Sequence, residues 1–222
     1  MSLQKNSAED WVALRANPAG TGLKLFFSAR HGFISAFFGL LVFTTGCLTV
    51  RVPEARQEKE IVALAEKLSR LSPDVSPGES QRAADAAVRY PLQLARDWHA
   101  TPPAVLNNVF INAGWHSRGL CFQWADDLTV KLMTLHLQTL ELHRGVAHLG
   151  TKHEHSCVVL TAPGQNFTNG IALDAWRHSG RLNWSPVLAD HYPWKEVELI
   201  PSYREELRAA AEKLEALAGA AH

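Results

Sequence analysis

The stretch that most constrains the fold is residues 118–135, where a cysteine begins an apolar segment. It starts Arg-Gly-Leu-Cys-Phe-Gln-Trp-Ala-Asp-Asp, with the cysteine at position 121. After Cys121, apolar residues recur at helical spacing, namely Trp124, Leu128, Leu132 and Leu135. This pattern predicts a helix that begins at Cys121 and buries one face against the rest of the protein.

The position of Cys121 on the first turn of this helix has two interpretations, a reactive thiol and a buried side chain. The first turn of a helix presents unpaired N–H groups and the positive end of the helix dipole, and both stabilise a thiolate. The simpler interpretation is a small buried side chain at a helix start, which is the commoner fate of cysteine. The segments that follow favour the reactive role.

Three runs after the helix predict strands. Residues 141–149 are rich in apolar residues and histidine, and residues 153–161 form a β-branched run that ends at Ala-Pro-Gly. Residues 171–177 form the next expected strand, and residues 182–188 return after a turn. Side chains two apart on a strand share a face, which places His153, His155 and Cys157 together.

Asp174 lies within an apolar strand, where a carboxylate is costly without a partner. A histidine on the neighbouring strand is the natural partner, with His155 preferred and His153 as the alternative. A cysteine nucleophile, a histidine base and an aspartate that orients the histidine form the thiol version of a catalytic triad. We therefore take Cys121, His155 and Asp174 as the candidate catalytic residues.

Other side chains are candidates for the cleft around this triad. The N–H of Cys121 is the simplest oxyanion donor, and a side-chain donor would add to it. The candidates for an oxyanion or cleft role are Trp115, Gln123 and Trp176, while His116 is a candidate for the mouth of the cleft and residues 191–194 for an aromatic rim. His143 and His148 are expected to be structural or exposed.

Three segments resemble the transglutaminase-like branch of the papain-like cysteine enzymes. These segments are Gly119-Leu-Cys-Phe-Gln-Trp-Ala125, His155-Ser-Cys-Val-Val159 and Ala172-Leu-Asp-Ala-Trp176. The resemblance spans residues 101–188. It implies an α+β fold, a Cys-His-Asp triad without a cofactor, and acyl transfer on amide or peptide bonds, by a peptidase, an amidase or a transglutaminase.

The first fifty residues indicate export. Residues 32–50 carry no charge and follow a segment with basic residues, which is the layout of a secretory signal. The run Thr44-Thr-Gly-Cys47 resembles a bacterial lipoprotein signal, which implies a lipid on Cys47. An uncleaved membrane anchor is the alternative, because 19 uncharged residues approach the length of a span. Either interpretation predicts a domain attached to a membrane on the periplasmic side of a bacterial cell envelope.

The expected organisation is a signal or anchor over residues 1–46, a tether over 47–54 and one domain over 55–222. The domain is predicted to be α+β, with a helical front half, a small antiparallel sheet packed on the cysteine helix and a closing helix. Amphipathic helices are expected over 55–72, from 76 to 98, from 101 to 114 and from 202 to 217, with a kink or break at Pro91. Capping boxes are expected at Ser76 with Glu79 and at Ser202 with Glu205.

Composition limits the partners. Lysine plus arginine and aspartate plus glutamate both number 22, so no basic field indicates nucleic acid. A peptide or protein substrate is what the resemblance implies. Three alternatives to a thiol enzyme stay open. The first is a catalytically inactive relative that acts as a binding module of an envelope protein complex. The others are a Cys121–Cys157 disulfide and a metal site built from His153, His155 and the two cysteines, although no metal-binding spacing supports the last.

Overall fold

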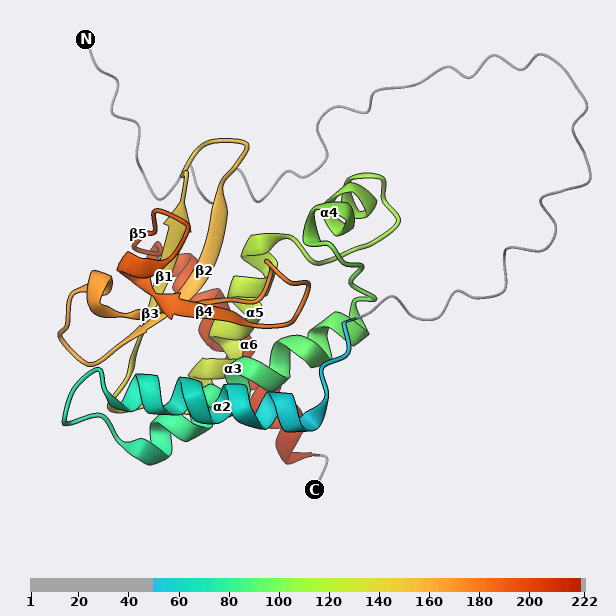
Figure 1. Cartoon of the computed structure of the whole chain (residues 1–222). Helices are drawn as coiled ribbons and strands as arrows, with labels where there is room; N and C mark the ends of the chain where they lie inside the picture. Colours follow the sequence, from blue (N-terminus) through green and yellow to red (C-terminus); the bar gives the residue numbers. More distant parts are fainter. Residues whose placement is uncertain (1–49, 221–222) are drawn as a thin grey trace, which may run out of the picture.

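The computed structural model describes residues 50–220 of the 222-residue chain. The fold is α+β, with helices at the front, a five-stranded antiparallel sheet and a closing helix, as the sequence predicts (Figure 1). The signal or anchor segment and Cys47 lie outside the described residues. Within residues 50–220, no helix has both the length and the apolar character required to cross a membrane.

The described helices follow the apolar periodicity of the sequence. They are α2 (Glu54–Ser69), α3 (Pro77–Asp97), α4 (Ala104–Asn112), α5 (Cys121–Met133) and α6 (Pro201–Gly219). Helix α3 continues through Pro91 without ending there, which resolves the expected kink or break in favour of one helix. Helix α5 begins at Cys121, as the sequence predicts.

The strands form one antiparallel sheet in the order β4-β3-β2-β1-β5. They are β1 (Glu141–Ala147), β2 (His155–Thr161), β3 (Ile171–Asp174), β4 (Asn183–Pro186) and β5 (Lys195–Glu196). Short 3-10 turns, η1 (Phe167–Asn169) and η2 (Val187–Ala189), lie between them. The expected strand 171–177 stops at Asp174, so Trp176 lies in the following turn and does not share a strand face with Asp174.

The two faces of the sheet bury different partners. On one face, Val158, Leu160 and Leu173 pack with the apolar sides of α2, α3 and α5. On the other face, alternate residues including Val159 and Ala172 pack with residues of η1, η2 and the segment before β5. Helix α6 covers the outer side of α5 (Figure 1). The sheet therefore has helices on one side and short turns on the other.

Glu79 joins the front helices to the sheet in a way that the sequence did not predict. Ser76 Oγ accepts the Glu79 N–H at 3.4 Å, which is half of the expected capping box. The Glu79 carboxylate does not return to the helix start but accepts the N–H groups of Gln138 and Thr139 and the Thr139 hydroxyl. The second expected box is wrong, because α6 has Ile200 as its N-cap and no side-chain cap.

Candidate active site

Cys121 occupies the first helical position of α5, with its side chain half-buried and its thiol free. Its Sγ lies 3.7 Å from the carbonyl oxygen of Glu154, the residue before β2. Helix geometry leaves the Cys121 N–H without an intrahelical acceptor. The helix start therefore brings the sulfur to the end of the sheet, with a backbone donor beside it.

The turn that leads into Cys121 is tightly fixed. Gly119 has φ +124°, and a Cβ added there would lie 2.2 Å from the amide nitrogen of Asn107. The side-chain oxygen of Gln123 accepts the N–H groups of Gly119 and Leu120 at 2.8 and 3.0 Å. Gln123 thus caps α5 from within its first turn and holds the backbone that presents Cys121.

His155 and Asp174 form the buried polar pair that the sequence predicts. The Nε2 atom of His155 lies 2.7 Å from Oδ2 of Asp174, and the two residues are 3% and 1% exposed. Strands β2 and β3 are neighbours, which brings the first residue of one beside the last residue of the other. The expected pairing of Asp174 with a histidine is confirmed, and the histidine is His155.

His155 also interacts with Cys121. Within residues 50–220, no side chain or backbone group forms a hydrogen bond with its buried Nδ1 atom, and the cysteine sulfur favours the protonated ring. Burial lowers the pKa of His155, but hydrogen bonding and charge from Asp174 and Cys121 outweigh it and raise the pKa to about 9. The imidazole is therefore hydrogen-bonded to Asp174 through Nε2, and the surrounding groups keep the ring protonated.

Asp174 has further partners that tie it to the following turn. Its Oδ1 accepts the N–H groups of Trp176 and Arg177 at 3.0 and 3.2 Å. Its Oδ2, which contacts His155, also accepts Nε of Arg177 at 3.0 Å. The carboxylate is therefore fixed by four donors, three of them from the turn and one from the histidine.

Arg177 joins Asp174 to a second buried carboxylate, that of Asp190. Its Nη2 donates to Asp190 Oδ1 at 2.9 Å, and Asp190 also accepts the Ser185 hydroxyl at 2.6 Å and the Tyr192 N–H at 2.9 Å. Burial raises the pKa of Asp190, but these three donors together with the Arg177 charge lower it below its ordinary value. One guanidinium thus connects the triad aspartate to the segment before β5.

Aromatic side chains enclose the imidazole. The rings of Trp176, Tyr192 and Trp194 have centroids 4.7, 4.6 and 5.3 Å from that of His155. Arg177 lies over the Tyr192 ring at 4.8 Å. Such an enclosure excludes water from the imidazole–carboxylate pair, which strengthens their interaction. Tyr192 and Trp194 belong to the aromatic turn for which a rim position was predicted.

The remaining cleft candidates lie in different surroundings. Trp115 is 74% exposed and packs on Phe110, with ring centroids 5.4 Å apart. Gln123 uses its oxygen to cap α5, as described above. Trp176 lies against His155 and donates its indole N–H to Asn108 of α4 at 3.2 Å. Of these three, the structure brings Trp176 into contact with the triad histidine.

The other histidines have separate positions. His153 is exposed, His143 contacts Glu196 and Thr161, and His148 is exposed in the turn after β1. His116 Nδ1 lies 2.7 Å from the side-chain oxygen of Asn107, the residue that also packs on Gly119. His116 is therefore near the turn that precedes Cys121.

Cys157 is a free thiol buried in the sheet face opposite the helices. Burial raises its pKa well above the ordinary value, and a Cβ on Gly145 would lie 2.8 Å from its sulfur. Cys121 and Cys157 are not joined as a disulfide. Among residues 50–220, no three His, Cys, Asp or Glu side chains are grouped so as to hold a metal ion.

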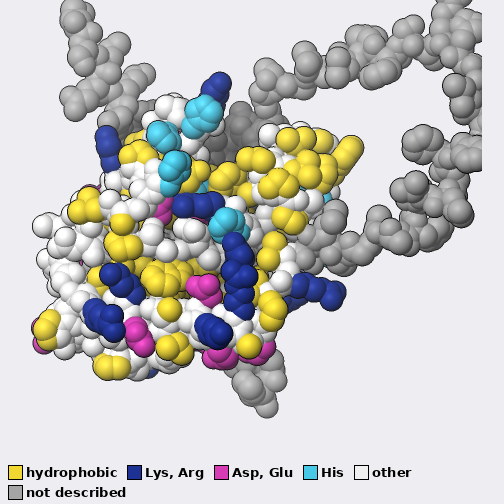
Figure 2. Space-filling view, viewed as in Figure 1, with side chains coloured by type: hydrophobic (Ala, Val, Ile, Leu, Met, Phe, Trp, Pro, Cys, Tyr) yellow, Lys and Arg dark blue, Asp and Glu magenta, His cyan; other side chains and the backbone are white. Residues whose placement is uncertain are grey.

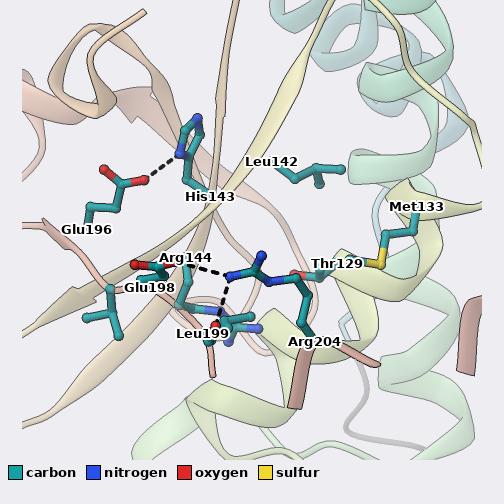
Figure 3. A pocket seen from close by; sticks show the side chains of 10 residues that line it. Thr129, Met133, Leu142, His143, Arg144, Glu196, Glu198, Leu199 and Arg204 are labelled. Carbon is teal, nitrogen blue, oxygen red and sulfur yellow. Dashed lines mark hydrogen bonds and ion pairs between the residues drawn. The ribbon is translucent and has the colours of Figure 1, made fainter. Parts of the chain in front are cut away.

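A cavity of about 510 Å³ lies away from the triad, between α5, β1, β5 and α6 (Figure 3). The polar side chains along it form two pairs, His143 with Glu196 at 2.6 Å and Arg204 with Glu198 at 3.4 Å. None of its lining residues is Cys121, His155 or Asp174. The cavity and the triad are therefore separate features of the domain.

Sequence reasoning missed Arg177 and Asp190. The available signal was a pair of aspartates, each directly preceded or followed by apolar residues, with two arginines, Arg177 and Arg181, between them in the chain. Two carboxylates in apolar surroundings require a shared cation, and Arg177 is three residues from Asp174.

Comparisons of the chain with protein-family models, curated proteins and solved structures find no match.

Proposed function

We propose that this protein is a thiol enzyme that transfers acyl groups from amide or peptide bonds, with a papain-like or transglutaminase-like arrangement of its α+β fold. The observation that carries the proposal is that the His155 imidazole interacts with both the Asp174 carboxylate, 2.7 Å from Nε2, and the Cys121 sulfur. A nucleophile, a base and a group that orients the base are the three parts that such chemistry requires.

In the proposed reaction, Cys121 and His155 start as a thiolate–imidazolium pair, with the cysteine proton on Nδ1 of His155, and the thiolate attacks the carbonyl carbon of the substrate. A C–S bond forms, and the Cys121 N–H donates to the oxyanion that results. The C–N bond then breaks, and His155 gives its proton to the leaving amine. Water or a second amine attacks the thioester, and His155 takes the proton of the attacking group. The C–S bond then breaks, which regenerates the Cys121 thiolate beside the protonated His155.

Asp174 serves this chemistry by fixing the imidazole. Its bond to Nε2 keeps the proton on that nitrogen in the neutral ring, so that Nδ1 is the atom free to accept a proton. The aromatic enclosure excludes water from the pair, and Arg177 prevents the carboxylate from turning away. Each polar contact around the ring thus favours one orientation and one tautomer.

The proposed address is the membrane of a bacterial cell envelope, with the domain on the periplasmic side. It is supported by the uncharged run at residues 32–50 and by Cys47, the candidate lipid attachment site. Peptides or proteins of the envelope would then be the substrates. The balance of 22 basic and 22 acidic residues fits a soluble surface with no nucleic-acid partner.

One observation favours a second function, a binding module without catalysis. His155 is 3% exposed and enclosed by three aromatic rings, which restricts the access of a substrate to the histidine. In that case the buried polar pair would be structural, and Cys121 would react as an ordinary thiol.

Alkylation of the reduced, full-length protein separates the two functions. For the thiol enzyme, iodoacetamide labels Cys121 rapidly even below pH 6.5, and His155→Ala shifts this labelling to higher pH. Peptide mass spectrometry assigns the label, and buried Cys157 in the same molecule is the internal control. Labelling of Cys121 with the pH dependence of a simple thiol, unchanged in His155→Ala, would overturn the enzyme proposal.

A further inference from the structure

Helix α4 exposes Val105, Leu106 and Val109 and buries only Ala104 and Asn107. Val105 is 61% exposed and Val109 is 59% exposed, and they lie one helical turn apart. Within residues 50–220, eight large hydrophobic side chains are exposed, and four of them belong to this helix and the turn after it, namely Val105, Leu106, Val109 and Trp115. These four residues form what we call the α4 patch.

The α4 patch is an apolar surface without charge. Helix α4 contains no acidic or basic residue, and Trp115 extends the patch through its packing on Phe110. Figure 2 shows apolar side chains gathered over the region of α4. A concentration of exposed apolar groups on one small helix indicates a surface that meets another apolar phase.

The chain enters the domain beside the segment that leads from α3 into α4. Residues 50–52 line a hollow together with Leu92, Arg96 and His99, at the end of α3. Helix α4 begins five residues after His99, and Figure 1 shows the segment before α2 beside the connection between α3 and α4. The first described residues and α4 therefore lie on the same side of the molecule.

The short stretch of chain before the first described residues limits the distance between a membrane and the side of the domain that carries α4. The uncharged run ends at Val50, and Cys47 precedes Val50 by three residues, which span at most roughly 10 Å when extended. Arg51 and Arg96 are exposed beside the same hollow and match the negative charge of anionic lipid headgroups. Attachment through Cys47 or through the run itself would thus bring α4 to the bilayer surface.

We propose that the α4 patch inserts into the membrane interface as a second contact beside the N-terminal attachment. The proposal rests on the membrane address proposed above, and it is independent of the thiol chemistry. Apolar helices with a tryptophan at one end are suited to this position, because the indole ring prefers the boundary between headgroups and acyl chains. The contact would hold the domain in one orientation, with the turn before Cys121 close to the lipid surface.

Tryptophan quenching tests the proposal on the full-length protein in vesicles of phosphatidylethanolamine and phosphatidylglycerol that carry brominated acyl chains. All variants contain Trp11→Phe, which removes the tryptophan that precedes the uncharged run. We expect bromine to quench part of the emission, and Trp115→Phe to remove most of that quenching. Trp184→Phe is the matched control and keeps the quenching, since Trp184 is half-buried beside Glu60 of α2.

A second pair of variants tests the helix itself. Val105→Ser with Val109→Ser should reduce the quenching of Trp115, whereas Val62→Ser, at a 50% exposed position on α2, should not. Vesicle flotation is measured in parallel. A protein that floats but shows equal quenching with and without Trp115 overturns the α4 contact alone, while a protein that does not float overturns the membrane address as well. Cross-linked dimers with an unquenched Trp115 would assign the patch to a second copy instead.

Discussion

At the scale of single residues, the protonation of His155 links the candidate site to the stability of the domain. The pKa of about 9 in the folded protein exceeds the ordinary value of 6.5. The protonated ring therefore contributes stability that is fully present below pH 6.5 and is lost as the pH rises toward 9. The full contribution is on the order of 3 kcal/mol.

This linkage predicts a matched difference in urea unfolding. Between pH 6.5 and 9, the free energy of unfolding of the native protein should fall more steeply than that of His155→Gln. Cys121→Ala should also make the fall shallower, because the sulfur no longer favours the protonated ring. His153→Gln, at an exposed position, should match the native protein. Parallel curves for the native protein and His155→Gln would contradict the raised pKa.

Arg177 is the residue whose loss should most affect the site without removing a member of the triad. Arg177→Gln leaves Asp174 and Asp190, both with side chains 1% exposed, without their shared cation. We expect a loss of roughly 3 kcal/mol in the free energy of unfolding, together with slower alkylation of Cys121 below pH 6.5. Arg177→Lys should recover part of the stability and part of the alkylation rate. The lysine ammonium keeps the positive charge, but it lacks the planar guanidinium that donates to both carboxylates.

The control for this prediction lies in the same turn. Arg181→Gln removes an arginine that has no ion pair to Asp174 or Asp190 among the described residues, so it should behave like the native protein. Equal stability of Arg177→Gln and Arg181→Gln would show that the guanidinium does not position the aspartate. The same network means that Asp174→Asn should disturb the fold as well as the site, because an amide nitrogen would face one of four donors.

At the scale of elements, Glu79 joins the start of α3 to the segment before β1. Burial raises the pKa of Glu79, but hydrogen bonds from Thr139 and Gln138 outweigh it and lower the pKa below 4.5. This carboxylate therefore contributes stability above pH 4.5 that is lost as the pH falls through its lowered pKa. Glu79→Gln should cost about 1–3 kcal/mol at neutral pH, because its amide cannot accept from all three donors.

Urea unfolding at two pH values checks this prediction. The gap in unfolding free energy between the native protein and Glu79→Gln should narrow in acid, where the native carboxylate is protonated. Glu66→Gln is a suitable control, since Glu66 is exposed on α2 and contacts only Arg70 among the described residues. A gap that stays constant into acid would exclude a role for the charge of Glu79.

The same elements show what the sequence could predict. Apolar spacing located the helices, and the helix start at Cys121 followed from it because periodicity is a local property. The pairing of His155 with Asp174 was also predictable, because a buried carboxylate needs a partner. The end of β3 was not predictable, because the turn that follows the strand is fixed by Arg177 and Asp190, which come together only in the folded protein. The role of Glu79 was misjudged because the groups that donate to its carboxylate lie about sixty residues away.

At the scale of the whole molecule, the proposed membrane attachment depends on residues outside the described domain. Cys47→Ala should release the protein from the membrane fraction or leave it unprocessed, because a thioether-linked lipid cannot form on alanine. Mass spectrometry and membrane fractionation measure both effects. Cys157→Ala controls for the loss of a cysteine, and an unchanged mass and partition of Cys47→Ala would favour a plain transmembrane anchor.

The order of the elements along the chain has a consequence for how the protein is made. The candidate catalytic residues lie at positions 121, 155 and 174, so all of them follow α2 and α3 in synthesis. The two front helices can pair early, since they pack on each other, but their apolar faces stay uncovered until α5 and the sheet arrive. The thiol, the imidazole and the carboxylate come together only when β3 joins β2. A chain that has not yet released β3 therefore carries the cysteine and the histidine without the carboxylate that orients the ring, so the candidate site is complete only when most of the domain has been made.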